Sequence, residues 1–513
     1  MSVLSRGLFT LLACGPIAAF AAGTTPYTAE AMWGLARLGN PTLSPDGALA
    51  VVPVTRYDLG TNKGSTDLWT IPAAGGAARQ LTSDKANDTA PAFSPDGRWV
   101  AFLSKRGDDE QNQIYVIAVD GGEAKRLTNV PVGAGAFKWF PDGKHIAFVA
   151  DVWPDLVKWE DQGTRLKERA EAKSSAKVWE RAPIAYWDHF LDDREPHLFS
   201  IPLAGGETTA ITRGSGYWLS KQEYSTSSYD ISPDGTEVAF VADRDRSGID
   251  PNDDIIVIPA CGCKPARNLN ADSIADESNP VYSPDGRYLA YSQKRTPRFY
   301  ADTQRLMLLD RTGGTTRGLT GQWDRSADGL VWASDSKSIY GQIDDAATSR
   351  IYRFALTGGA PRAVTGASSF SGLEVAGKVA IALRQSFSEP AALVRLDLAK
   401  GAITKLSDFN DGALASLAMG KVESVTYKGA RGDPIQMWVI YPPGFDPAKK
   451  YPVYMLLHGG PHNGIQDALT YRWNAHVFAN WGYIVTWHNF HGSSGFGQAF
   501  ADSINPDRIT LPY

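Results

Sequence analysis

The chain has 513 residues, of which 43% are hydrophobic and 21% are charged, and its formal net charge is −5. This length exceeds what one hydrophobic core usually serves, so the sequence predicts two or more domains. The charge balance excludes the basic surface typical of nucleic-acid-binding proteins. No apolar run reaches the length of a membrane span.

The N-terminus has the pattern of an export signal. Arg6 supplies a positive charge, residues 8–20 form a short apolar segment, and residues 19–21 are a small-x-small cleavage site. Because Gly15-Pro16 would break a buried helix, we expect residues 1–21 to be a signal peptide and the mature protein to be periplasmic or secreted. A lipid anchor on Cys14 is disfavoured, because the apolar segment before it is very short.

A Ser-Pro-Asp-Gly segment followed by an apolar strand recurs along the chain. In such a turn Pro fixes φ, the Asp side chain caps the turn, and Gly releases the chain into the next strand. The complete copies begin at Ser44, Ser94, Ser232 and Ser283, and variants begin at Phe140 and Ala333.

The other half of the repeat is an apolar strand, a glycine hairpin and a strand that ends in Leu-Thr or a related pair. Its copies begin at Asp67, Gln113, Leu198, Ile255, Leu306, Ile351 and Leu393. Each unit offers four short antiparallel strands over about 45–50 residues, the size of a propeller blade. A β-sandwich would need no fixed period. The sequence therefore predicts an all-β, seven-bladed β-propeller over residues 28–410, with no strand swapped between its ends.

One blade carries an insertion over about residues 151–197. Its charged part, residues 157–170, is expected to be helical in part, and residues 186–190 (Tyr-Trp-Asp-His-Phe) form an aromatic cluster. Insertions on propeller loops often line the binding face. A surface excursion packed by its own aromatic residues fits the sequence equally well.

Two cysteines occupy Ala-Cys-Gly-Cys, where other repeats have a turn. Cys261 and Cys263 are too close for an ordinary disulfide framework, and no neighbouring Cys or His cluster suggests zinc. We interpret the pair as a turn variant and expect no metal site.

The pattern changes after residue 412. The predicted elements are strands at 422–427, 435–441 and 452–457, a helix at about 465–481 and a strand at 483–487. An apolar strand, a helix and another strand in this order are typical of an α/β domain with a mostly parallel sheet. The apolar strand at 452–457 runs into His458-Gly459-Gly460-Pro461-His462.

The propeller repeats, this apolar strand, the His-Gly-Gly-Pro-His segment and residues 489–497 (Asn-Phe-His-Gly-Ser-Ser-Gly-Phe-Gly) occur in an order that resembles the prolyl oligopeptidase family of serine peptidases. The chain is most similar to its acylaminoacyl-peptidase and dipeptidyl-peptidase-5 branch, in which Arg is common at the position of His491. The resemblance implies that residues 411–513 are the N-terminal part of an α/β-hydrolase domain. It also implies that no metal or organic cofactor is needed.

The resemblance further implies that Gly459 and Gly460 belong to the loop that forms part of the oxyanion hole. Glycine lets backbone N–H groups approach the substrate carbonyl closely. His458, His462 and Asp188 are candidate active-site neighbours, and Asp188 is a candidate contact for the substrate's N-terminus. For His458, a satisfied histidine at a strand end is favoured over a catalytic base.

The catalytic triad is not found in the chain. An α/β-hydrolase needs Gly-x-Ser-x-Gly on a strand-to-helix turn, followed by Asp or Glu and then His. No such pentapeptide follows Tyr483, and Ser493 and Ser494 are interpreted as turn residues. We therefore expect a C-terminally truncated serine peptidase for short peptides, inactive as it stands. The alternative is a catalytically inactive β-propeller module that binds peptides or proteins. The sequence leaves open whether the protein forms homo-oligomers.

Overall fold

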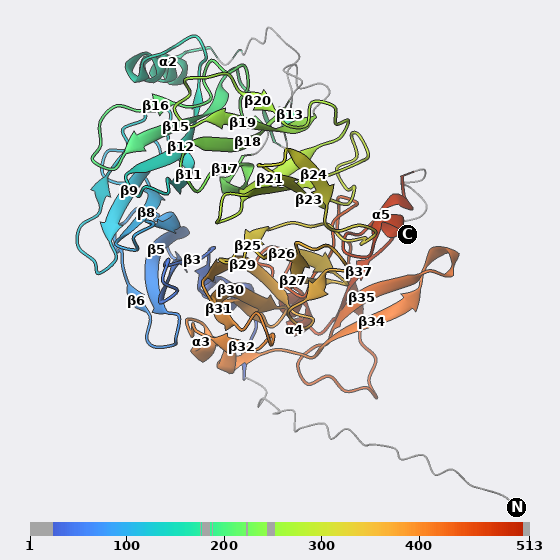
Figure 1. Cartoon of the computed structure of the whole chain (residues 1–513). Coiled ribbons are helices and arrows are strands. Elements are labelled where there is room, and N and C mark those ends of the chain that lie inside the picture. Colours follow the sequence, from blue (N-terminus) through green and yellow to red (C-terminus); the bar gives the residue numbers. More distant parts are fainter. Residues whose placement is uncertain are drawn as a thin grey trace, which may run out of the picture.

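The computed structural model describes residues 24–174, 176, 185–186, 188–221, 224–243 and 252–505. The expected signal peptide with Cys14, and residues 506–513, lie outside this part of the chain. Within it, antiparallel sheets follow one another around a ring, and a mixed sheet lies beside that ring (Figure 1). None of the described helices combines the length and the apolar character needed to cross a membrane.

Each sheet of the ring is built from strands that follow one another in the chain, except that the separate pair β13 and β14 interrupts the third sheet. The first sheet contains β2 (Arg37–Leu38), β3 (Thr42–Leu43), β4 (Leu49–Asp58), β5 (Lys63–Pro72) and β6 (Arg79–Gln80). The second contains β7 (Thr89–Phe93), β8 (Trp99–Ser104), β9 (Gln113–Ala118) and β10 (Lys125–Arg126). The third contains β11 (Gly135–Trp139), β12 (His145–Val152), β15 (Glu195–Pro202) and β16 (Thr209–Ala210). The fourth and fifth contain β17 (Tyr229–Ile231), β18 (Glu237–Asp243), β19 (Asp253–Pro259) and β20 (Arg267–Asn268); and β21 (Glu277–Tyr282), β22 (Tyr288–Gln293), β23 (Arg305–Asp310) and β24 (Thr315–Gly318). The last two contain β25 (Val331–Trp332), β26 (Ser338–Asp345), β27 (Thr348–Ala355) and β28 (Arg362–Ala363); and β29 (Ser369–Ala376), β30 (Val379–Ser386), β31 (Glu389–Leu396) and β32 (Ile403–Lys405).

The Ser-Pro-Asp-Gly segments form the predicted turns. The Ser44 hydroxyl donates to Asp46 Oδ1 (2.6 Å) and accepts the amide of Leu49 (2.9 Å), and Gly47 has a φ of 72°. The same two serine contacts recur at Ser94, Ser232 and Ser283. The serine thus ties the two arms of the turn together.

The threonine that ends the repeat satisfies a buried amide of the neighbouring strand. Thr82 Oγ1 accepts the amide of Leu68 (3.0 Å), and Thr128 Oγ1 accepts that of Ile114 (2.8 Å). Both threonines are buried. An unpaired amide there would cost free energy comparable to a lost hydrogen bond, so the threonine stabilises each sheet.

Packing between sheets closes the ring. Val52 and Ile71 of the first sheet lie in one apolar core with Ile381 and Leu393 of the last. Within the described residues no strand is exchanged between these two sheets. Near this seam, the short strands β1 (Thr25–Pro26) and β33 (Leu417–Ala418) pair in parallel, and α1 (Ala29–Trp33) follows β1. The architecture is that of a β-propeller.

The insertion lies between β12 and β15. It contains α2 (Trp159–Glu171), which confirms the expected helix, and the strand pair β13 (Ala185–Tyr186) and β14 (His189–Phe190). Buried Gln162 bonds the backbone N and O of Trp153 at 2.9 Å each, so α2 is anchored to the end of β12. A 3₁₀ turn at Thr226–Ser228 precedes β17.

The mixed sheet has the order β34 (Val422–Lys428), β35 (Pro434–Ile440), β37 (Ile484–Asn489), β36 (Val453–Leu456). The strands predicted in this region are confirmed, and β36 and β37 pair in parallel. Helices α3 (Asp411–Ser416), α4 (Ala475–Asn480) and α5 (Gln498–Asp502) and a 3₁₀ turn at Ala430–Gly432 complete this unit. Its core includes Trp438 and Trp487 and extends to Phe387 of the propeller.

The helix expected over residues 465–481 is wrong for its first part. Only α4 is helical, and Asn474 caps it by accepting the amides of His476 and Val477. Residues before Asn474 contact the propeller instead: Asp467 donates its amide to Ala347 O (2.9 Å) and accepts the amide of Phe387 (2.8 Å). These tertiary hydrogen bonds replace those of a helix.

The interpretation of Cys261 and Cys263 as a plain turn also needs correction. The two residues form a disulfide, with their Cα atoms 5.2 Å apart. Gly262 between them has a φ of 60°, and a Cβ there would clash with Ala210 O of β16. Glycine therefore allows the tight turn that brings the two Sγ atoms together.

Candidate functional site

The candidate site is the glycine turn, defined as residues 458–463, which follows β36. Asn463 Nδ2 donates to Gly459 O (3.0 Å), and Tyr300 Oη donates to Gly460 O (3.1 Å). Among the contacts of the described residues, the amides of Gly459 and Gly460 donate to no protein acceptor. Both residues are exposed. Their N–H groups are therefore available to a negatively charged oxygen.

Glycine is required at position 460. Gly460 has a φ of 136°, and a Cβ there would lie 3.0 Å from His462 N and 3.1 Å from the Asn463 side chain. A larger residue would push the turn away from Asn463 and disturb the direction of its amides.

His458 is held on the inner side of the turn. Its ring stacks on Phe490 with 4.2 Å between ring centroids, and Nε2 lies 3.0 Å from Ser493 Oγ. Burial lowers the pKa of His458, so the ring is neutral at pH 7. Ser493 is 0% exposed, and its hydroxyl donates to Phe490 O (2.7 Å). These contacts suit a satisfied histidine and a turn serine rather than a nucleophile and its base.

His462 joins three segments at the far end of the turn. It is buried, and Nδ1 lies 3.0 Å from Gly492 O, in the loop after β37. The rings of Phe299 and Tyr300 meet its ring edge-on, both with centroids 5.3 Å away. The turn is thus packed between its own domain and the propeller.

Asp188 belongs to the insertion and not to the segments that surround the glycine turn. It is exposed in the turn between β13 and β14, and Figure 1 draws β13 apart from β37, the neighbour of β36. The propeller residue that bonds Gly460 is Tyr300, not a residue of the insertion. A role for Asp188 in substrate binding stays a prediction.

His491, at a position where Arg is common in the prolyl oligopeptidase family, has a hydrogen-bond partner of its own. His491 is buried, its Nε2 lies 3.0 Å from Asp433 Oδ2, and its ring stacks on Phe500 at 5.0 Å. This histidine fixes the loop after β37 to the turn before β35.

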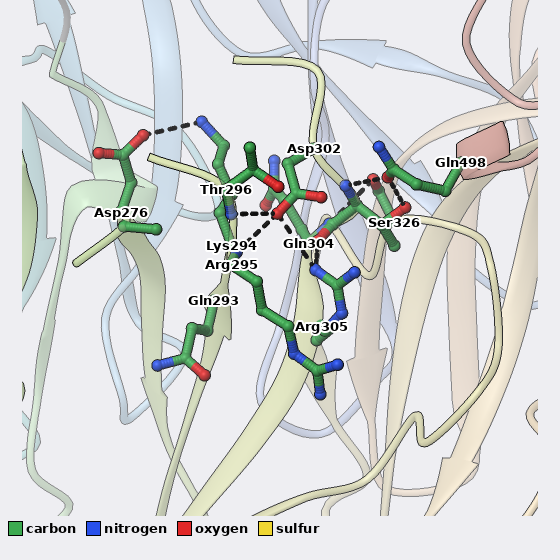
Figure 2. A network of polar contacts seen from close by, with 12 residues as sticks. Asp276, Gln293, Lys294, Arg295, Thr296, Asp302, Gln304, Arg305, Ser326 and Gln498 are labelled. Atoms are coloured by element: carbon green, nitrogen blue, oxygen red, sulfur yellow. Dashed lines mark hydrogen bonds and ion pairs between the residues drawn. The ribbon is translucent and has the colours of Figure 1, made fainter. Parts of the chain in front are cut away.

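A propeller loop, residues 294–304 between β22 and β23, brings Tyr300 to the glycine turn, and Figure 2 shows the polar contacts of this loop around Asp302. Asp302 is buried at its centre and accepts the amides of Arg295 (2.6 Å) and Thr296 (2.9 Å). The next residue, Thr303, donates its amide to Gln498 Oε1 of α5 (2.6 Å). Phe299 and Tyr300 in this loop were missed from sequence; two adjacent aromatic residues in a long inter-strand connection are the signal that could have found them.

In the part of the chain that the structure describes, no group of three or more His, Cys, Asp or Glu residues is arranged to hold a metal ion.

Comparisons with protein families match both parts of the chain. Residues 63–160 match the family described as the Tricorn protease N-terminal beta propeller domain. Residues 469–508 match the prolyl oligopeptidase family.

Curated relatives cover nearly the whole chain. It is 29% identical to dipeptidyl-peptidase 5 of Porphyromonas gingivalis, over 98% of this chain and 74% of that protein. It is 30% identical to dipeptidyl-peptidase 5 of Porphyromonas endodontalis, over 94% of this chain and 69% of that protein.

Solved structures share the fold. An acylaminoacyl peptidase in complex with Z-Gly-Gly-Phe-chloromethyl ketone matches with a TM-score of 0.74 and 18% identity, over 94% of this chain and 69% of that one. The acylaminoacyl peptidase of Pyrococcus horikoshii matches with a TM-score of 0.73 and 17% identity, over the same shares.

Proposed function

Since the chain belongs to the prolyl oligopeptidase family of serine peptidases, we propose that it supplies the propeller and the oxyanion loop of an enzyme that removes dipeptides or blocked amino acids from short peptides. One observation carries this proposal. Gly459 and Gly460 present amide N–H groups that no protein acceptor uses among the described contacts. They follow a parallel strand, as the oxyanion loop of an α/β-hydrolase does.

The glycine turn would act on the charge that develops during peptide cleavage. A serine hydroxyl attacks the scissile carbonyl, a histidine takes its proton, and an aspartate orients that histidine. The carbonyl oxygen becomes negative, and the amides of the glycine turn would donate to it. Removing one such donor typically lowers kcat about 10²–10³-fold.

We also propose that the ring is a seven-bladed propeller over residues 28–410 and that residues 411–513 are one part of a larger hydrolase domain. The sheets that follow one another around the ring support the first part. The second part is supported by an exposed apolar row on and directly after β36: Val453, Met455 and Leu457 are 59%, 57% and 53% exposed. Large apolar side chains in a row on one sheet face are typical of a surface that packs against further structure. The triad would then lie in sequence not printed here.

The sequence itself favours one alternative. The printed chain contains no Gly-x-Ser-x-Gly, as expected for a catalytically inactive propeller module that binds peptides or proteins. The same ring and glycine turn would then position a peptide without cleaving it.

Export to the periplasm or the cell exterior belongs to the same proposal. The support is the disulfide between Cys261 and Cys263, because disulfides persist mainly in oxidising compartments.

A fluorophosphonate probe, which labels activated serines, tests the proposal. We expect no specific labelling of the 513-residue chain, because Ser493 is buried and already donates to Phe490 O. The full-length product of the gene should label at one serine, and Gly460→Val in that protein should slow labelling strongly.

Two outcomes would contradict the proposal. One is specific labelling of the 513-residue chain itself. The other is a full-length product that carries no labelled serine, which would favour the binding module.

A further inference from the structure

We propose that Tyr300, on the propeller loop between β22 and β23, is a positioning residue for the oxyanion loop. Its hydroxyl would hold the Gly460 carbonyl and thereby the orientation of the glycine turn. This inference rests on the proposed function of that turn. The residue would act through Gly460 and would not itself touch the reacting atoms.

The carbonyl oxygens of Gly459 and Gly460 accept hydrogen bonds from different parts of the molecule. In a trans peptide the C=O of one residue and the N–H of the next point in opposite directions. Asn463 Nδ2, which donates to Gly459 O (3.0 Å), and His458 Nδ1, which lies 3.1 Å from the same oxygen, therefore set the direction of the Gly460 N–H. Tyr300 bonds Gly460 O (3.1 Å) and so fixes the next peptide plane, which joins Gly460 to Pro461 and carries no N–H; it restrains the Gly460 N–H from the other side of the Gly460 Cα. Glycine resists rotation less than any other residue, so these bonds supply the restraint that a side chain would provide elsewhere.

The loop that carries Tyr300 is itself rigidly placed. Buried Asp302 accepts the amides of Arg295 and Thr296 and also bonds Arg305 Nη1 (3.2 Å). Thr303 bonds Gln498 through both its amide and its hydroxyl. The loop is therefore tied to the propeller on one side and to α5 on the other, as Figure 2 shows.

The Tyr300 ring and the Tyr300 hydroxyl have separable contacts. The ring packs edge-on against His462 at 5.3 Å, together with Phe299, while the hydroxyl alone reaches Gly460. Although the residue is 58% exposed, its hydroxyl bonds the glycine turn from outside the turn's own domain. The geometry of the oxyanion loop thus depends on the docking of the propeller.

Tyr300→Phe in the full-length protein is the test. It removes the hydroxyl and keeps the ring contact with His462. A net hydrogen bond of ordinary strength corresponds to a kcat about threefold to tenfold lower on a dipeptide-releasing or acyl-amino-acid substrate. The KM should stay within about twofold, because the lost restraint matters most when the oxyanion forms. Hydrogen exchange of Ile465, whose amide donates to Asn489 Oδ1 (2.6 Å) directly after the glycine turn, should become faster.

Tyr441→Phe is the matched control, because the Tyr441 hydroxyl donates to Glu423 Oε2 (2.7 Å) away from the glycine turn. We expect wild-type kcat and wild-type exchange at Ile465 for this variant. An unchanged kcat and exchange rate in Tyr300→Phe would overturn the inference, and so would an equal loss in the control. A change in KM alone would also overturn it, because Tyr300 would then bind substrate. If the wild-type protein cleaves no peptide, the proposed function fails, and the exchange measurement still decides whether Tyr300 holds the turn.

Discussion

The carboxyl groups of buried Glu277 and half-buried Asp253 lie where the fourth and fifth sheets of the propeller meet. Burial, with further contributions from Asp276 and Asp243, raises the pKa of Asp253 to about 7. Burial also raises the pKa of Glu277 to about 7, although Gln293 donates to its Oε1 (2.8 Å). The nearest cation, Lys294, is paired with Asp276 at 3.0 Å. Both carboxyls are therefore costly to ionise in the folded state.

The pH dependence of stability follows from these raised values. Between the ordinary carboxyl pKa and pH 7 the folded state binds more protons than the unfolded state, so the free energy of unfolding falls as the pH rises through this window. Glu277→Gln keeps an acceptor for Gln293 and removes the charge. We expect its melting temperature to exceed that of the wild type by a few degrees at pH 8 and to match it near pH 4. Thermal unfolding at both values measures this.

Exposed Glu123 offers the control for this measurement. Glu123→Gln should follow the wild-type pH profile throughout. If Glu277→Gln also follows the wild-type profile, Glu277 ionises without cost in the folded protein and the argument from burial is wrong.

For single residues, the sequence predicted those roles that follow from local backbone geometry. The turn roles of Pro, Asp and Gly follow from backbone preferences, and the structure adds the serine that bonds Asp46 and Leu49 at the first turn. Tyr300 could not be found this way, because its bond to Gly460 joins two segments far apart in sequence. The Cys261–Cys263 disulfide was missed because spacing rules for disulfide frameworks do not cover a pair separated by one glycine.

Among the secondary-structure elements, β36 has the most unusual environment. It lies at the edge of the described sheet and exposes Val453 and Met455, as the chain does at Leu457 directly after it, while Leu456 faces the core. An exposed apolar edge strand is a template for association with other chains. The 513-residue protein should therefore self-associate as its concentration rises.

Met455→Lys should reduce this self-association, because a charged residue on an edge strand disfavours pairing with another chain. Sedimentation velocity over a concentration series measures it, with Thr316→Lys on exposed β24 as the control. A wild-type chain that stays monomeric at all concentrations would contradict the prediction, as would equal effects of the two lysines.

The elements themselves were predicted with uneven success. The strands predicted at residues 422–427 and 435–441 match β34 and β35 to within one residue at each end, because their apolar spacing also fits their pairing. The helix over residues 465–474 failed, because Asp467 bonds Phe387 and Ala347 of the propeller in place of helical neighbours. Contacts between domains override local helix preference, and a single sequence does not reveal them.

At the scale of the whole molecule, a cation surrounded by aromatic rings joins the propeller to the C-terminal unit. The Arg37 guanidinium lies over the rings of Trp33 (4.1 Å), Tyr57 (4.3 Å) and Tyr471 (3.8 Å). The first two rings belong to the start of the propeller, and Tyr471 precedes α4 in the C-terminal unit. Among the described residues its buried Nε and Nη2 have no hydrogen-bond partner, so the rings provide most of the stabilisation of this cation.

Arg37→Ala should loosen the docking of the C-terminal unit. Loss of a desolvated cation–π contact costs about 2 kcal/mol, and hydrogen exchange of residues 467–474 should accelerate while exchange in the central propeller sheets stays unchanged. Arg98→Ala, in an exposed pair with Asp96, should change neither. Unaltered exchange at residues 467–474 in Arg37→Ala would show that the contact of Arg37 with the three rings does not hold the two units together.

The seam between the first and last sheets also has a consequence for how the chain folds. Most strands of the ring pair with near neighbours in sequence, and such hairpins form in microseconds. Val52 and Ile381 meet across the seam, and they come from opposite ends of the propeller sequence. Closing this seam joins segments that lie farther apart in sequence than those of any other two neighbouring sheets of the ring, so it carries the largest loop-closure entropy among the contacts between sheets. We therefore expect closure of the circle to be the last and slowest event of propeller folding, and a polypeptide emerging from synthesis to remain an open arc until its final sheet is made.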